Sequence, residues 1–205
     1  IEGIRIYIAD CSTDNTRRVI ENHKDWLDVE VIEGGPVSVA KNNGAYLVTT
    51  PYILFIDADV RFFSNTVIYD TLKQMKEENL HLIGLNIKCY DSDLMAQLSF
   101  SIFNVLNKIL SKWIPFAVGA YLLTRKDKFY EHGKFPCKYP TSEDFHLSRK
   151  YDPKKFKIAK HYFGQDSRRF KKMGYLGMSV YLIKNFLFKD NHNYWNNIDE
   201  KRYWS

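Results

Sequence analysis

Short apolar runs alternate with amphipathic stretches through residues 1–90, and this order restricts the possible folds more than any other feature of the sequence. Alternation of strand and helix is typical of βαβ units, which build a largely parallel sheet. We therefore predict an α/β fold with a mostly parallel central sheet flanked by helices. The segments behind this prediction are strands at residues 4–9, 28–35, 52–57 and 81–89, and helices at about 14–23, after Pro36 and at 64–77.

The second half of the chain is less regular, and we predict its segments one by one from periodicity and turn residues. Length and composition are ordinary for one globular domain, so we expect a single domain over residues 1–205. The expected elements are a helix at about residues 93–112, a strand at 117–124, a short helix ending at Lys150, a strand near 156–162 and a basic, aromatic helix at about 167–188.

Charge is divided unevenly along the chain. Residues 1–107 contain 9 Lys and Arg against 15 Asp and Glu, whereas residues 108–205 contain 21 against 9. The basic half fits an anionic partner. A diphosphate ligand, a nucleic acid and an acidic membrane face are all compatible with it, and so is a plain solvated surface.

Two carboxylates, Asp57 and Asp59, close the apolar strand in YILFIDADV. Side chains two residues apart in a strand point to the same side. Two close carboxylates repel each other unless a cation lies between them, and Mg²⁺ and Mn²⁺ prefer oxygen ligands. The pair is consistent with a metal site, and equally with a polar strand end that turns the chain.

Five stretches, in this order and at these spacings, resemble the family 2 glycosyltransferases, which have the GT-A fold. They are IADCSTDNT, GGPVSVAKNNGAYLVTTPYILFIDADV, VGAYLLTRKDKFYEHGKF, SEDFHLSRK and SRRFKKMGY, and they extend over most of residues 4–175. The resemblance implies an inverting, metal-dependent enzyme with Mn²⁺ or Mg²⁺ as cofactor. Such an enzyme moves a sugar from a nucleotide-diphosphate donor to a hydroxyl of a glycan, lipid-linked or protein-linked acceptor.

The resemblance also divides the chain into three parts. Residues 1–90 would bind the nucleotide, residues 91–175 would form the acceptor and catalytic half, and residues 176–205 would form a basic, aromatic helical segment. Family members usually begin with a strand carrying a P-x-x-N type turn, before the strand that opens this chain. We therefore expect a GT-A fold lacking the usual first strand. Three explanations stay open: residues precede Ile1 in the native protein, the fold closes the gap, or the chain binds without turnover.

In the nucleotide-binding part, the resemblance implies roles for several acids. Asp10 would bind the base or ribose, with Ser12 closing the turn, although Ala9 stands where the family has a further acid. Asp59 would ligate the metal that binds the donor diphosphate. Asp57 would contact ribose, sugar or metal.

Two further stretches match family positions around the donor. Lys41, Asn42 and Gly44 correspond to the family's R-N-x-G, in which the basic residue lies near the nucleotide and the glycine permits close packing. Gly119 and Ala120 would line the sugar site.

The catalytic base of the family corresponds to Asp144, with Glu143 beside it. From the residues alone, Asp144 could equally be an ordinary acidic residue at a helix N-terminus. His161 is a candidate third metal ligand. Arg168 and Arg169 are candidates for clamping the diphosphate, because a guanidinium matches phosphate oxygens in bidentate fashion; a solvated basic helix face is the alternative.

Two other functions remain open. LFIDADV also resembles the D-x-D strand of the haloacid dehalogenase phosphohydrolases, which use an Asp nucleophile; Val60 fits that pattern, but Arg61 stands where it has glycine. A non-catalytic sugar-nucleotide-binding protein is the other alternative.

Aromatic and basic residues interleave from Phe163 to Tyr203, as in segments that rest at a membrane interface. We predict weak peripheral membrane contact, no spanning segment and no nucleic-acid partner. The expected location is the cytoplasm, with contact at the inner face of a membrane.

Overall fold

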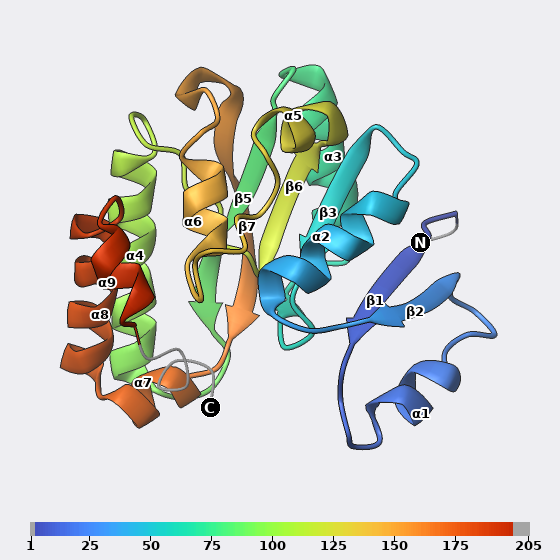
Figure 1. The fold of residues 1–205 in the computed structure, drawn as a ribbon, viewed down its shortest axis with the longest axis horizontal. Coiled ribbons are helices and arrows are strands. Elements are labelled where there is room, and N and C mark those ends of the chain that lie inside the picture. The colour runs from blue at the N-terminus through green and yellow to red at the C-terminus, as the bar shows by residue number, and fades with distance from the viewer. Residues whose placement is uncertain (1–2, 199–205) are drawn as a thin grey trace.

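The strands of the structure, a computed structural model that describes residues 3–198, form two sheets (Figure 1). One sheet has two parallel strands, β1 (Ile6–Asp10) and β2 (Val29–Glu33). The other has five, in the order β3-β6-β5-β7-β4. These five are β3 (Tyr52–Ile56), β4 (Arg61–Phe62), β5 (Leu82–Cys89), β6 (Tyr121–Arg125) and β7 (Phe156–Gln165).

Helices cover both faces of the larger sheet (Figure 1). They are α1 (Thr16–Glu21), α2 (Val37–Leu47), α3 (Val67–Glu77), α4 (Leu94–Leu110), α5 (Lys126–Glu131), α6 (Glu143–Ser148), α7 (Arg168–Met173), α8 (Tyr175–Leu187) and α9 (His192–Asn196), with one 3-10 turn, η1 (Pro153–Lys155). The α/β class and the flanking helices agree with the prediction.

The larger sheet is mixed rather than mostly parallel, which corrects the sequence-based expectation. β5 and β7 run parallel, but β6 is antiparallel to both of its neighbours, β3 and β5. The cause is the segment 111–120, which brings the chain back along β5, so that β6 starts opposite the middle of β5 and runs toward Leu82. As a result, the turn at residues 118–120 lies at the same sheet edge as the end of β3.

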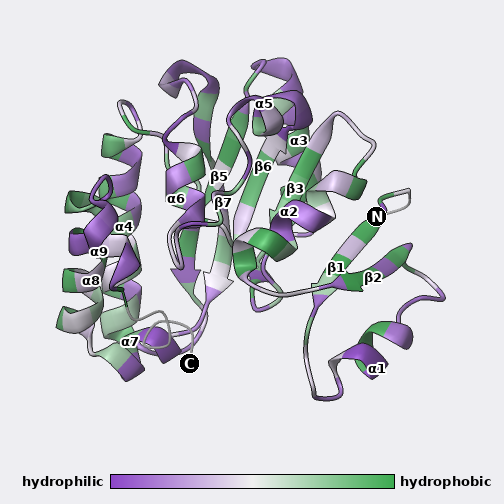
Figure 2. Cartoon of the chain, in the orientation of Figure 1, coloured by the Kyte–Doolittle hydropathy of each residue, from purple (hydrophilic) through white to green (hydrophobic). Residues whose placement is uncertain are grey.

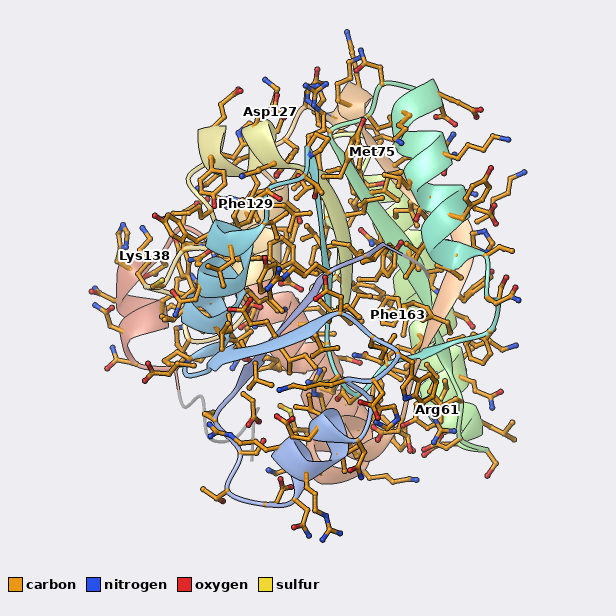
Figure 3. The ribbon with its side chains drawn as sticks, turned by 90° about the vertical axis from the view of Figure 1, so that its right-hand side faces the viewer. Arg61, Met75, Asp127, Phe129, Lys138 and Phe163 are labelled. Carbon is orange, nitrogen blue, oxygen red and sulfur yellow. The ribbon has the colours of Figure 1, made fainter. Side chains whose placement is uncertain are left out.

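Side chains alternate between two cores, one on each face of the larger sheet. Leu82 and Leu122 pack with α2, α5 and α6, whereas Ile83 and Leu123 pack with α3 and α4. In the edge-on view, Phe129 of α5 and Met75 of α3 lie on opposite sides of the sheet (Figure 3). Both faces of the larger sheet are therefore buried, and this packing holds the ends of its strands in place.

Some predicted details differ from the structure. The helix predicted at about residues 14–23 is shorter in the structure, where α1 spans Thr16–Glu21, and Ile20 is its buried residue. The third helix starts at Val67, because Ser64 accepts a hydrogen bond from the N–H of Thr66 in a turn before the helix.

The long helix predicted near residues 167–188 is divided in two. Gly174 has φ 73° and separates α7 from α8, because a right-handed helix cannot continue through that conformation. The strand predicted from residue 117 begins only at Tyr121, whose N–H donates to the carbonyl of Val118 at 3.0 Å.

Candidate active site

A cluster of acids surrounds the ammonium group of Lys41, at the sheet edge where β3 ends. The Nζ of Lys41, on α2, lies 3.0 Å from Oδ1 of Asp57 and 3.5 Å from Oε1 of Glu143, and it donates to the carbonyl oxygen of Gly119 at 3.2 Å. Asp57 directly follows β3, Gly119 lies in the turn before β6, and Glu143 begins α6. The Lys41 side chain is only 13% exposed. One nearly buried cation therefore joins four separate parts of the chain.

The charge of Lys41 is maintained by its neighbours. Burial alone disfavours a protonated amine, but the carboxylates of Asp57, Glu143 and Asp144 outweigh that effect and raise the pKa of Lys41 above its ordinary value. The ammonium group is thus a fixed positive charge at the centre of the cluster.

Asp144, the predicted catalytic base, lies in the same cluster. The backbone N–H of Gly119 donates to its Oδ2 and the N–H of Phe145 to its Oδ1, both at 2.7 Å. Burial and the negative charge of Glu143 raise the pKa of Asp144 to about 7, although Lys41 and the two N–H donors act in the opposite direction. Near neutral pH this carboxyl group is therefore poised to accept a proton.

Residue 119 has to be a glycine for this cluster to assemble. A Cβ added at Gly119 would lie 2.9 Å from Nζ of Lys41 and 3.2 Å from both Cβ and Oδ2 of Asp144. The backbone of Gly119 also uses its carbonyl for Lys41 and its N–H for Asp144. Close approach of backbone to functional groups is a common reason for glycine at such a position.

The chain enters α6 through a strained residue that α8 holds in place. Ser142 has φ 64°, in the left-handed region that residues other than glycine rarely adopt. The Oγ1 of the preceding Thr141 lies 2.7 Å from the hydroxyl of Tyr181, and Nδ2 of Asn185 donates to Oγ of Ser142 at 3.2 Å. These contacts fix the first turn of α6, which contains Asp144.

Asp59, the second acid of the D-x-D stretch, pairs with an arginine from a distant part of the sequence. Nη2 of Arg168, at the start of α7, donates to Oδ2 of Asp59. The two side chains are 59% and 36% exposed, respectively. They line a small pocket with Gln165, Asp166 and Arg169. This pair is open to solvent, unlike the contacts of Lys41.

Asp10, at the end of β1, is held as a carboxylate. The N–H and hydroxyl of Ser12 donate to its Oδ1, and Nε of Arg17 donates to its Oδ2 at 3.1 Å. The hydrogen bonds from Ser12, followed by the smaller effect of Arg17, lower the pKa of Asp10. A Cβ at Gly34 would lie 2.7 Å from the carbonyl carbon of Asp10, so the chain after β2 requires glycine there.

Comparison with known families bears directly on this arrangement. The Glycosyl transferase family 2 model matches residues 5–133, well over half of the chain. The chain belongs to this family. A search of curated proteins found no match.

Solved structures similar to this family 2 chain include other glycosyltransferases. Residues 1–349 of TarS from S. aureus are 17% identical, with a TM-score of 0.59, and the match covers 85% of this chain and 53% of that one. The mannosyltransferase PcManGT from Pyrobaculum calidifontis, solved in complex with GDP-Man and Mn²⁺, is 16% identical, with a TM-score of 0.58, over 87% and 54%. TarS 1–349 in complex with UDP is 17% identical, with a TM-score of 0.55, over 79% and 51%. This chain thus spans about half the length of these proteins, and it shares the GT-A fold with them.

A metal site in this family 2 chain would have to be completed by its ligand. Within residues 3–198, no three His, Cys, Asp or Glu side chains are grouped so that they could hold a metal by themselves. The Nε2 of His161, the predicted third ligand, lies 3.0 Å from Oδ2 of Asp70 on α3, and its role at a metal stays a prediction. Asp57 forms an ion pair with Lys41, and Asp59 forms one with Arg168. One or two carboxylates plus phosphate oxygens are the ligands Mg²⁺ commonly takes, so the pair fits a metal that arrives with a diphosphate.

The structure shows the contacts of three other positions singled out by the family resemblance. The amide of Asn42 donates to the carbonyl of Phe135 at 2.9 Å and accepts from its N–H at 3.1 Å, so it anchors the loop after α5. A Cβ at Gly44 would make an ordinary 3.7 Å contact with Ile32, so packing does not require glycine there. Ala120 is buried in the core and its carbonyl accepts from the N–H of Asp57 at 3.3 Å, whereas Gly119 contacts Lys41 and Asp144 directly.

The sequence did not lead us to predict the contact of Arg17 with Asp10 or the hydrogen bonds from α8 to residues 141 and 142. One signal for Arg17 was available, because a cation in the first turn of a helix is opposed by the helix dipole and therefore suggests a nearby acid. For Tyr181 and Asn185 no sequence signal exists, since both contacts join segments about 40 residues apart.

Proposed function

We propose that this chain is the donor-binding and catalytic part of a glycosyltransferase that uses a nucleotide-diphospho-sugar and inverts the anomeric centre. The observation that carries the proposal is the joining of Asp57 and Asp144 through Lys41 and Gly119. Asp57, at the end of β3, is thereby placed beside Asp144, the proposed base, whose pKa is about 7. Membership of family 2 supports the same class of reaction.

In this proposal residues 1–90 bind the nucleotide and residues 91–175 position the acceptor. Asp10, with Ser12, accepts hydrogen bonds from the base or ribose. Asp59 and Asp57 would hold Mn²⁺ or Mg²⁺ together with the diphosphate, and such an ion would stabilise the negative charge of the leaving group. Support for a nucleoside-diphosphate donor comes from two relatives, TarS solved with UDP and PcManGT solved with GDP-Man.

Arg168 and Arg169 bind phosphate oxygens of the donor in this scheme. Arg168 presently pairs with Asp59 across a solvent-exposed contact. Exposed ion pairs are weak, so a diphosphate can take over the guanidinium at little cost. Donor binding therefore replaces Asp59 by a phosphate oxygen as the partner of Arg168.

The transfer step is a single displacement. The acceptor oxygen attacks the anomeric carbon from the side opposite the diphosphate, a bond forms between them, and the bond from that carbon to the diphosphate oxygen breaks. The proton of the acceptor hydroxyl passes to the carboxylate of Asp144, which is held by the N–H groups of residues 119 and 145. Gly119, whose N–H holds Asp144, lines the sugar site in this scheme. The acceptor is a hydroxyl of a glycan, a lipid-linked or a protein-linked molecule.

A donor panel tests the proposal. UDP- and GDP-linked sugars are added to the protein with and without Mn²⁺, and thermal stabilisation and nucleotide release are measured. We expect at least one donor to stabilise the protein only with Mn²⁺, and Asp59→Asn to abolish that effect. Absence of Mn²⁺-dependent binding for every donor would contradict the proposal. Binding without any nucleotide release would indicate a non-catalytic binding protein, and Asp57-dependent release of phosphate from a phosphomonoester would indicate a phosphohydrolase.

A further inference from the structure

Helix α4 is apolar around most of its circumference but is covered on only one side. Its inner side, with Ala96, Phe100 and Phe103, packs into the cores. At about 100° per residue, the outward apolar side chains fall within roughly 160° of the circumference. They are Leu94, Met95, Leu98, Ile102, Val105, Leu106, Ile109 and Leu110, each 42–76% exposed. A helix that is apolar on both sides is normally covered on both.

The neighbouring helix α8 adds a second apolar stripe. Leu176, Val180, Ile183 and Leu187 recur at helical spacing and are 41–79% exposed. The two helices lie side by side at the edge of the molecule farthest from the β1–β2 sheet, and hydrophobic residues predominate on α8 (Figures 1 and 2). These four residues and the eight of α4 are called the α4–α8 face. It is larger than the apolar patches that soluble monomers usually expose.

The charged residues within the two stretches that carry the α4–α8 face are all positive, and Asp93 and Asp190 lie just outside these stretches. The sequence contains no acid from Leu94 to Trp113, nor from Tyr175 to Lys189. The basic residues in these two stretches are Lys108, Lys112, Lys184 and Lys189. Trp113, which is 68% exposed, follows the end of α4. Apolar side chains bordered by lysines, with tryptophan at the margin, are typical of surfaces that lie in a membrane interface.

We propose that the α4–α8 face docks on a membrane that contains anionic lipid. Its apolar side chains enter the boundary between headgroups and acyl chains, while the lysines meet lipid phosphate and carboxylate groups. If two copies of this chain packed together through this face, their lysines would meet, and neither helix would supply an acid to pair with them. These charges therefore disfavour self-association through the α4–α8 face. No helix within residues 3–198 is long and apolar enough to cross a membrane.

The docking surface is directly connected to the candidate active site. The side of α8 turned toward the protein carries Tyr181 and Asn185, which hold Thr141 and Ser142 just before Asp144. Docking through α8 would therefore place the proposed base near the lipid surface, where a lipid-linked acceptor would be found. This last step rests on the proposed function, whereas the docking itself does not.

Vesicle sedimentation tests the docking without any measurement of transfer. The full chain is mixed with vesicles of phosphatidylcholine alone or of phosphatidylcholine with phosphatidylglycerol. We expect binding to the anionic vesicles, weaker binding at high salt, and little binding to phosphatidylcholine alone. The double variant Ile102→Glu, Val105→Glu should lower the partition coefficient about tenfold or more, because it places two charges in the apolar face.

Three further variants separate the contributions of α8 and of the lysines and control for the added charge. Ile183→Glu should weaken binding through α8 alone, and Lys108→Gln with Lys112→Gln should weaken it mainly for anionic vesicles. Tyr69→Glu, on α3, changes a residue that is 69% exposed outside the face, and it should bind like the wild type. Equal binding of the double variant and the wild type, or no vesicle binding by wild type, would overturn the proposal. A dimer in solution that the double variant dissociates would instead assign the face to a second copy.

Discussion

Among the described residues, Asp57 and Asp59 of the D-x-D stretch each form an ion pair, and the two ion pairs differ chiefly in their exposure to water. Lys41 joins Asp57 and Glu143 with side chains that are 13%, 32% and 7% exposed. The pair of Arg168 and Asp59 is 59% and 36% exposed. Breaking a buried ion pair leaves a charge with no solvent to replace its partner, whereas an exposed pair exchanges readily. The comparison indicates that Lys41 holds the cluster in place, whereas a ligand can replace Asp59 as the partner of Arg168.

The largest expected effect concerns the base held by the buried cluster. Asp144→Asn should lower the transfer rate about 10³-fold, because the amide cannot accept the hydroxyl proton. Donor affinity should change only a few-fold, since the side chain keeps its shape. Steady-state kinetics at saturating donor and calorimetric titration of the donor measure the two effects. Asp152→Asn, at the start of η1, serves as a control that should leave both unchanged. A rate loss below tenfold would refute the assignment.

The next prediction compares how much each of the two ion pairs contributes to the free energy of unfolding. Lys41→Met should lower the free energy of unfolding by about 3 kcal/mol, because it leaves largely buried carboxylates without their cation. Arg168→Met should lower it by less than about 1 kcal/mol, since both partners are open to water. Urea denaturation of the two variants gives the comparison. Equal losses would show that burial does not distinguish the contacts.

The pH dependence of transfer sharpens the description of the buried cluster. The base must be deprotonated to accept a proton, so the rate should rise with pH through about 7 and then level off. Glu143→Gln removes a negative charge that raises the pKa of Asp144, so the rising limb should move to lower pH. Rate profiles at saturating substrates test this shift. A limb that stays in place would show that Glu143 does not act on Asp144.

The smallest expected effect concerns the exposed pair. Arg168→Met should tighten Mn²⁺ binding to the donor-free protein a few-fold, because Asp59 no longer has a competing cation. The same change should weaken donor binding, since a phosphate partner is lost. Titration of Mn²⁺ followed by electron paramagnetic resonance separates the two effects. Arg125→Met, which breaks an ion pair with Asp127 at the start of α5, is the matched control. Unchanged Mn²⁺ affinity in Arg168→Met would contradict the exchange.

Local patterns were sufficient to predict the ends of β1, β3 and β5 to within one residue. The positions of Asp10, Asp57 and Asp144 follow from strand ends and a helix start, which depend on neighbouring residues alone. Most helices were also located correctly, because their caps and periodicity are local. The family resemblance then joined these positions into one expected site.

The direction of β6 and the convergence on Lys41 could not be predicted in the same way. The first depends on the path of residues 111–120, which carries no periodic pattern. The second joins Lys41 to Glu143, about 100 residues away, through side-chain geometry. The contact between His161 and Asp70 could not be predicted either, because the two residues are far apart in the sequence.

The two hydrogen bonds from α8 to residues 141 and 142 have a practical consequence for shortening the chain. A version that ended at Met173 would keep Asp10, Asp57 and Asp144. It would nevertheless lose Tyr181 and Asn185, and Ser142 would be free to leave its left-handed conformation. Such a fragment would contain the complete set of proposed catalytic groups and still present its base in the wrong place, so inactivity of a truncated form would say nothing against the chemistry.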